Sequence, residues 1–170
     1  MNILETERLT IRELDAATDA AFVLELLNSP KFIKYIGDRG VQTVAEAVDF
    51  IENRYRQSYR DHGYGLYAIE RKGDQTPVGL CGFVRRNTLP GPDIGFAFLP
   101  DHEGKGYGFE SAHAMMKYGL EILGFTTILA ITSLDNDASG RLLEKLGFTF
   151  DQQIESGEEH LRLYSSHPQT

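Results

Sequence analysis

The stretch Glu103-Gly104-Lys105-Gly106-Tyr107-Gly108 separates two apolar runs that have different periods. Before it, residues 94–99 are apolar, rich in phenylalanine and followed by Pro100, a pattern that predicts a buried strand. After it, apolar side chains recur at helical spacing between residues 109 and 123, with charged residues on the opposite side. The sequence therefore predicts a strand, a glycine loop and an amphipathic helix.

A glycine loop at the start of a helix favours the binding of an anion. The first turn of a helix has unpaired backbone N–H groups and about half a positive charge, and Gly104, Gly106 and Gly108 let the backbone approach a phosphate closely. A nucleotide-binding loop would need Ser or Thr directly after Lys105, where this chain has Gly106. A dinucleotide-binding loop would need the spacing G-x-G-x-x-G near the first strand, whereas this loop is G-x-G-x-G and lies past the middle of the chain. Both motifs fit poorly.

A second strand and helix follow the first unit. Residues 126–132 are rich in β-branched side chains and predict a strand, residues 135–139 are typical of a helix start, and Gly147 is typical of a helix end. Together with the loop, this order resembles the GNAT superfamily of acyl-CoA-dependent N-acetyltransferases. The family's [Gln/Arg]-x-x-Gly-x-[Gly/Ala] loop matches residues 103–108 at its glycines. Its later signature is matched by Asn136, Ser139, Glu144, Lys145, Gly147 and Phe148.

The beginning of the chain extends this resemblance. Residues 5–12, Glu-Thr-Glu-Arg-Leu-Thr-Ile-Arg, are similar to the opening of the branch that contains the ribosomal-protein N-terminal (alanine) acetyltransferases. The resemblance therefore covers nearly the whole chain, and it places this protein nearest in pattern to that branch.

The remaining elements are predicted from local patterns. Residues 8–13 alternate as a strand, a first helix ends before Pro30, and a second helix begins at the capping box of Thr43 and Glu46 and ends at Gly63. Residues 31–40 between these helices are predicted to be irregular. Two hairpins are predicted, one from residues 64–71 and 77–86 and the other from residues 148–154 and 160–164.

Length and composition indicate one cytoplasmic α/β domain over residues 1–170. The chain lacks an apolar run of the roughly 20 residues that a membrane helix needs, and its acidic start is unlike a signal peptide. Its single cysteine cannot form an internal disulfide. A net charge of −8 argues against nucleic-acid binding and mildly favours a cationic acceptor such as an amine. The sequence does not distinguish a monomer from a homodimer.

The resemblance implies a fold and a way of binding acetyl-CoA. It implies a central mixed, mostly antiparallel sheet, flanked by helices, in which the parallel strands at residues 94 and 126 splay apart and admit the pantetheine arm. The arm is expected to pair with the backbone of Phe98 and Leu99, as an added strand would. Asn136 and Ser139 are expected to reach it from the other wall. The diphosphate is expected on the amides of Gly104, Lys105, Gly106, Tyr107 and Gly108. No metal is expected.

The first loop position departs from the family pattern. Glu103 stands where the family usually has Gln or Arg, and a carboxylate pointing inward would repel a diphosphate. We therefore expect Glu103 to face solvent, with the amides and Lys105 holding the diphosphate. A second interpretation of Lys105, as a solvated loop residue, stays open.

The transfer of an acetyl group to an amine needs a neutral amine, a stabilised oxyanion and a proton for the departing thiolate. Asp93 is the candidate base, because it precedes the strand where related enzymes often have Glu, although an Asp beside Pro92 is also typical of a turn cap. Backbone N–H groups near Ala97 and Phe98 are candidates to polarise the thioester carbonyl. The usual tyrosine position holds Leu143, which leaves water, Ser139 or the released thiol itself for the proton.

Two further residues have a functional and a structural interpretation. Tyr35 lies in the segment that borders the acceptor pocket in the GNAT fold, so it is a candidate for substrate contact, whereas aromatic residues of such a loop also serve to cover a core. Cys81 lies within a predicted strand, where a buried thiol is the more common case than a covalent acetyl carrier.

These observations predict an N-acetyltransferase that moves the acetyl group of acetyl-CoA directly to a primary amine, such as a protein N-terminal α-amine. A small-molecule amine, for example a polyamine, an amino acid or an antibiotic, is a second acceptor class. A non-catalytic acyl-CoA-binding module is a third interpretation, because the usual tyrosine is missing. A phosphotransferase would require a metal-binding Ser or Thr after Lys105, and that position is glycine.

Overall fold

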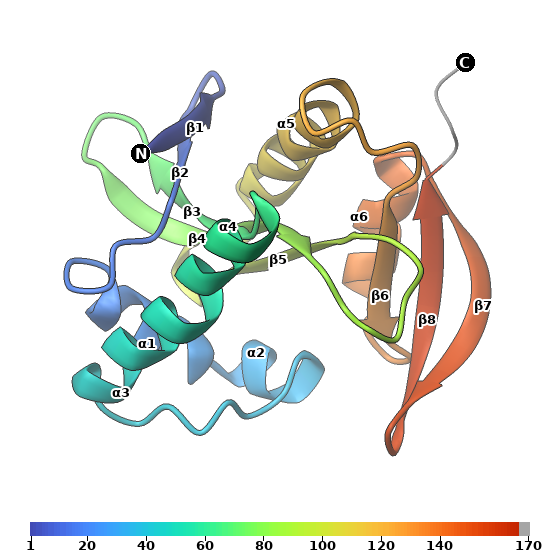
Figure 1. Ribbon diagram of the computed structural model, residues 1–170, viewed down its shortest axis with the longest axis horizontal. Helices are drawn as coiled ribbons and strands as arrows, with labels where there is room; N and C mark the ends of the chain where they lie inside the picture. The colour runs from blue at the N-terminus through green and yellow to red at the C-terminus, as the bar shows by residue number, and fades with distance from the viewer. Residues whose placement is uncertain (167–170) are drawn as a thin grey trace.

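An eight-stranded mixed sheet runs through the computed structural model, which describes residues 1–166 (Figure 1). Its order is β1-β2-β3-β4-β5-β6-β8-β7. The strands are β1 Asn2–Glu5, β2 Leu9–Arg12, β3 Leu66–Arg71, β4 Thr76–Val84, β5 Asp93–Phe98, β6 Leu129–Ser133, β7 Phe148–Ser156 and β8 Glu159–Ser166. The helices are α1 Ala20–Leu27, α2 Pro30–Tyr35, α3 Val44–Phe50, the π-helix η1 Ile51–Arg56, α4 Gln57–His62, the 3₁₀ turn η2 Pro100–His102, α5 Tyr107–Glu121 and α6 Asp137–Lys145.

Helices cover both faces of the sheet (Figure 1). Successive side chains along a strand belong to two separate hydrophobic cores, one on each face. In β3, Ile69 belongs to the core under α5 and α6, whereas its neighbour Ala68 belongs to the core under α1, α2, α3 and η1. This alternation follows from the pleat of a strand, which sends successive side chains to opposite faces. None of the helices within residues 1–166 is long and apolar enough to cross a membrane.

The pair β5 and β6 carries the feature that positions the site. β5 is antiparallel to β4 along its whole length, from Val84 opposite Asp93 to Gly79 opposite Phe98. Its parallel register with β6 consists of Asp93 opposite Leu129, where the Leu129 N–H donates to the carbonyl of Pro92 at 2.9 Å. Beyond this point the two strands separate. The predicted splayed parallel pair in a mostly antiparallel sheet is thereby confirmed.

Most predicted elements are found, and three differ. Residues 31–40, predicted to be irregular, contain α2, whose first residue is Pro30; a proline fits the first turn because no N–H is needed there. The strand predicted from residue 126 begins only at Leu129, where its partner β5 begins, and β1 was not predicted. The helix predicted between residues 43 and 63 has the expected cap, since the Thr43 side chain accepts from the Glu46 N–H, but contains the π-helix.

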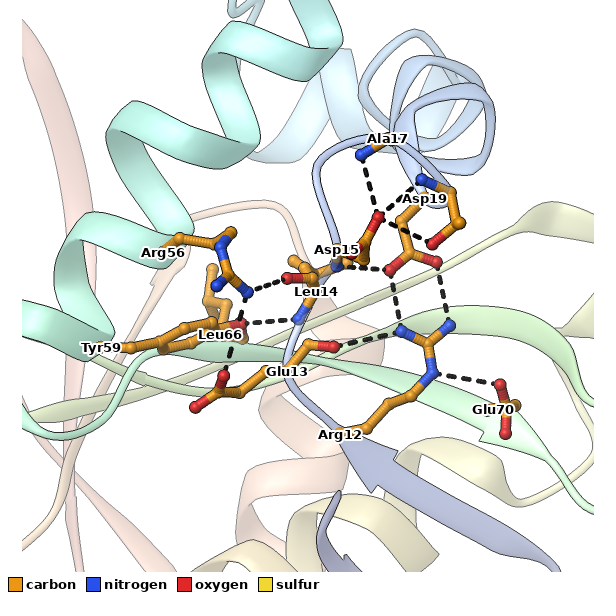
Figure 2. A network of polar contacts seen from close by, with 11 residues as sticks. Arg12, Glu13, Leu14, Asp15, Ala17, Asp19, Arg56, Tyr59, Leu66 and Glu70 are labelled. Atoms are coloured by element: carbon orange, nitrogen blue, oxygen red, sulfur yellow. Dashed lines mark hydrogen bonds and ion pairs between the residues drawn. The ribbon is translucent and has the colours of Figure 1, made fainter. Parts of the chain in front are cut away.

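A polar network joins the helical layer to the sheet (Figure 2). Arg12 of β2 donates to both carboxylate oxygens of Asp19 at 2.8 and 2.9 Å, and to Glu70 of β3 at 3.0 Å. The Tyr59 hydroxyl of α4 accepts from the Leu14 N–H at 3.1 Å. It also donates to the carbonyl of Leu66 at 2.5 Å. The network therefore ties the start of α1 to β2 and β3, and ties α4 to the start of β3.

Candidate active site

The glycine loop lies at the open end of the separated strands. β5 ends at Phe98, the turn η2 follows, and α5 begins at Tyr107. Gly104 and Gly106 have φ values of 74° and 84°, a left-handed conformation that favours glycine. Gly108 lies inside α5, where an added Cβ would come 3.4 Å from Leu142 of α6. The predicted need for backbone freedom therefore applies to Gly104 and Gly106, whereas Gly108 permits the close approach of two helices.

Arg8 of the β1–β2 turn holds this loop, a role that local sequence patterns did not reveal. Its Nη1 donates to the carbonyl of Lys105 at 2.9 Å, and its guanidinium lies 4.7 Å from the centre of the Tyr107 ring. Its Nε pairs with Glu110 at 2.6 Å. A Cβ on Gly106 would come 3.1 Å from Nη2. The loop thus has a cation beside its backbone as well as the start of α5.

Glu103 is turned away from the loop amides. Its carboxylate accepts from Nζ of Lys31 in α2 at 2.5 Å, and its side chain is about one-third exposed. We expected Glu103 to face solvent; instead it makes this partly exposed ion pair, which links the loop to α2. Lys105 is exposed and lies between the two left-handed glycines.

The wall formed by β5 differs from the prediction at one residue. The Leu99 N–H donates to the carbonyl of Val78 at 2.9 Å, and the Leu99 carbonyl accepts from the His102 N–H at 2.9 Å. The expectation that Leu99 has free backbone groups is therefore wrong. Along a strand, the main-chain N–H and C=O groups of successive residues point to opposite sides. Those of Ala97 therefore also point to β4, whereas those of Phe96 and Phe98 point to the gap.

Asn136 and Ser139 lie at the start of α6, directly after β6. The Asn136 side-chain oxygen accepts from the Ser139 N–H at 3.2 Å and so caps α6. The amide NH₂ of Asn136 is the group that remains to meet a ligand. Leu143, at the family's usual tyrosine position, is buried in the core beneath α6.

Two buried polar atoms lack a hydrogen-bond partner within residues 1–166, namely Nδ1 of His102 and Oγ1 of Thr132. His102 ends the turn η2 before the glycine loop, and Thr132 lies in β6 on the face that packs in the core beneath α5 and α6. Buried polar groups are nearly always paired in native proteins. The open groups that fit a pantetheine arm are instead the main-chain groups of Phe96 and Phe98, which point away from β4, and the side-chain amide of Asn136.

Asp93 lies at the closed end of the gap. Its side chain is 1% exposed, and both carboxylate oxygens accept from Nε of Arg86, at 3.1 and 3.3 Å. Burial raises the pKa of Asp93 to about 6, against the lowering effect of Arg86. Ala97 and Leu99, which follow Asp93 on the same face of the sheet, belong to the core under α1, α2, α3 and η1, so Asp93 points to that side of the sheet. The carboxylate thus pairs with Arg86 instead of capping the turn after Pro92.

Of the remaining candidates, one lies in α2 and the other in the core. Tyr35 ends α2 and is half-buried, with Nζ of Lys34 4.9 Å from its ring centre. Cys81 in β4 is fully buried, and desolvation raises its thiol pKa to about 12. A thiol of such high pKa is a poor nucleophile, which supports the interpretation of Cys81 as a core residue.

Comparison with known proteins gives consistent matches. A family model described as an acetyltransferase (GNAT) domain matches residues 8–149. YoaA, an uncharacterised N-acetyltransferase of Bacillus subtilis, is 29% identical over 86% of this chain and 82% of its own. The spermidine N(1)-acetyltransferase of Vibrio cholerae is 22% identical over 83% of this chain and 79% of its own. A crystal structure of an acetyltransferase from Agrobacterium tumefaciens superposes with a TM-score of 0.81 at 27% identity, over 96% of this chain and 93% of that one.

Proposed function

Because the chain belongs to the GNAT acetyltransferase family, we propose that its acetyl-CoA-dependent N-acetyltransferase activity modifies a primary amine, first of all the α-amine of a protein N-terminus. The observation that carries this proposal is the parallel pair β5 and β6, which separates beyond Asp93 and Leu129 and has a glycine loop at its open end. Acetyl-CoA supplies an activated acetyl thioester. The binding of acetyl-CoA and the removal of a proton from the amine depend on the residues around the gap.

Binding is assigned to both walls of the gap. The main-chain groups of Phe98 pair with the pantetheine arm, and the amides from Gly104 to Gly108 hold the diphosphate, because the start of α5 favours an anion. The Asn136 amide and the Ser139 hydroxyl contact the arm from α6. Since Cys81 is buried with a raised pKa, transfer is direct from acetyl-CoA to the amine in a ternary complex.

The proposed base is Asp93, acting through water because its carboxylate is covered. With a pKa of about 6 it is mostly ionised at neutral pH. An α-amine, with a pKa of about 7.7 to 8.0, is partly neutral there, whereas a lysine or polyamine amine near 10.4 is almost wholly protonated. A weak base at the closed end therefore supports an α-amine acceptor. The similarity of residues 5–12 to the N-terminal acetyltransferase branch supports the same class.

A small-molecule amine is the second candidate acceptor. The similarity to the spermidine N(1)-acetyltransferase of Vibrio cholerae supports a polyamine, and the net charge of −8 favours a cationic acceptor of either class. We assign Tyr35 to the acceptor side, since α2 carries it over the face of the sheet to which Asp93 points.

The test is thiol release from acetyl-CoA with three panels of acceptors: amino-terminal peptides, polyamines and free amino acids. We expect turnover with peptides that carry a free α-amine and none with the same peptides after N-terminal acetylation. Gly106→Trp should abolish turnover, whereas the matched Gly73→Trp should not, because Gly73 is also left-handed but lies in the β3–β4 turn with open space around it. Turnover with polyamines alone would overturn the α-amine assignment, and tight acetyl-CoA binding without turnover in any panel would favour a binding module.

A further inference from the structure

Arg86 is a charged side chain to which the proposed function gives no task. It lies two residues past Val84, the last residue of β4, and Val84 is opposite Asp93 in the ladder with β5. Residues opposite each other in a ladder share a face of the sheet, and a step of two residues along a strand returns to the same face. The backbone therefore favours an Arg86 side chain on the face where Asp93 lies.

The contact between the two side chains joins a buried carboxylate to a partly exposed cation. Nε of Arg86 donates to both Asp93 oxygens, at 3.1 and 3.3 Å. The Arg86 side chain is 39% exposed, whereas that of Asp93 is 1% exposed. An ion pair in a protein interior loses the hydration of both ions. Here the arginine keeps part of its hydration, so this pair costs less than a wholly buried one.

Arg86 is the only charged group within residues 1–166 that acts on the pKa of Asp93. It lowers this pKa, whereas burial raises it. The residues opposite Asp93 are Val84 in β4 and Leu129 in β6, and both are apolar. The helices on this face of the sheet pack in an apolar core. The ionised form of Asp93 therefore depends on this one arginine.

The β4–β5 loop holds Arg86 in place. Its carbonyl accepts from the Leu89 N–H at 3.3 Å, which closes a turn, and Pro90 and Pro92 restrict the backbone that follows. The carbonyl of Pro92 is paired with the Leu129 N–H of β6. The loop is thus fixed at both ends, and the guanidinium lies against the carboxylate in the protein without a ligand.

We infer, on the basis of the proposed function, that Arg86 is a positioning residue that keeps the Asp93 carboxylate ionised and oriented for proton removal from the amine. A carboxylate has about four lone-pair sites. One N–H of Arg86 faces both oxygens and leaves other sites for the water that relays the proton. In this step the amine gives a proton to the water, and the water gives one to Asp93. Arg86 stays charged throughout, because a guanidinium is not deprotonated in proteins.

The test combines the pH profile of thiol release with a titration of the Asp93 carboxyl by carbon-13 NMR. In the wild type, kcat/KM should rise up to about pH 6, because Asp93 must be ionised to act. Arg86→Gln should move this limb and the NMR midpoint upward by about one to three pH units, the usual effect of an arginine on a neighbouring carboxyl. Turnover should therefore fall at pH 7 and return as the pH rises.

Two further variants separate the charge of Arg86 from its geometry and from the loop. Arg86→Lys keeps the charge without the fixed N–H, so it should leave the midpoint near the wild-type value and lower kcat less than Arg86→Gln does at pH 7. The matched control is Arg85→Gln, which removes an exposed arginine from the same loop. It should change neither the midpoint nor kcat.

A double variant shows whether Arg86 acts through Asp93. In the Asp93→Asn protein, Arg86→Gln should cause no further loss of kcat, because the base that it positions is gone. A further loss as large as that in the wild type would overturn the inference. So would a loss that is equal at every pH with an unmoved NMR midpoint, which is the result expected of a purely structural residue.

The same data distinguish this inference from the proposed function. Normal wild-type turnover with an unmoved limb in Arg86→Gln would overturn the role of Arg86 and leave the acetyltransferase. A moved NMR midpoint with an unmoved limb would overturn Asp93 as the base and Arg86 with it. A wild type that turns over no acceptor in any panel would overturn the proposed function and this inference together.

Discussion

The two ends of β5 are built in different ways. At the open end the glycine loop takes its shape from the backbone, with left-handed φ at Gly104 and Gly106 and the first amides of α5 directly after them. At the closed end Asp93 is buried, and its surroundings come from side chains, chiefly Arg86 of the β4–β5 loop. A diphosphate needs many weak donors in a fixed curve, whereas proton removal needs one group of suitable pKa. The difference predicts that the loss of a single charge lowers kcat far more at the closed end than at the open end.

Replacing the Asp93 carboxylate gives the largest expected effect. Asp93→Asn should lower kcat about a hundredfold or more, the range found when a general base is removed. The wild-type kcat/KM should rise with pH up to about 6, because Asp93 must lose its proton to act, and this limb should vanish in the variant. The pH profile of thiol release measures both. Asp19→Asn is the control, since Asp19 is also buried and paired with an arginine, in the network of Figure 2.

The same substitution should change how stability depends on pH. Burial raises the folded-state pKa of Asp93 to about 6, above the unfolded value of about 3.9. Protonation therefore stabilises the folded state fully below pH 4, and this stabilisation is lost as the pH rises through 6. The difference of about two units is worth about 3 kcal/mol. Relative to the wild type, Asp93→Asn should gain about that amount between pH 4 and pH 7. Urea unfolding measures this difference. If the free energies of unfolding of the two proteins differed by the same amount at every pH, burial would not raise the pKa of Asp93.

The contrast between the ends also explains what the sequence could predict. The glycine loop, the strand before it and the capped start of α6 were predicted because each is encoded by neighbouring residues. The hydrogen bond of Leu99 with Val78 was not predicted, because the partner strand β4 determines which residues of β5 point their main-chain groups toward it. Other features depend on how separate segments pack together, which no local sequence pattern predicts. These features are the contact of Asp93 with Arg86, the contact of Arg8 with Lys105 and the unpaired hydroxyl of Thr132.

Arg8 tests whether backbone alone shapes the open end. Arg8→Ala removes the bond to the Lys105 carbonyl and the cation beside Gly106. We expect the KM for acetyl-CoA to rise about tenfold, the usual effect of one lost charge-assisted bond, with kcat changed less than about threefold. The control is Arg60→Ala, an exposed arginine of α4 that pairs with Glu52. A collapse of kcat equal to that of Asp93→Asn would contradict the division of roles between the two ends.

Glu103 gives the smallest expected effect, because its charge is already turned toward Lys31. Glu103→Gln breaks an exposed ion pair, which is worth about 0.2 to 1 kcal/mol, and removes a negative charge near the proposed diphosphate site. These changes act on different quantities: stability falls slightly, whereas CoA affinity rises by at most about threefold at low salt and less at high salt. Titration calorimetry at two salt concentrations measures the change in CoA affinity separately from the change in stability. If CoA affinity rose tenfold or more, the Glu103 carboxylate would lie close to the diphosphate. Binding at the open end would then depend on side-chain charge, as the chemistry at the closed end does, and not on backbone shape.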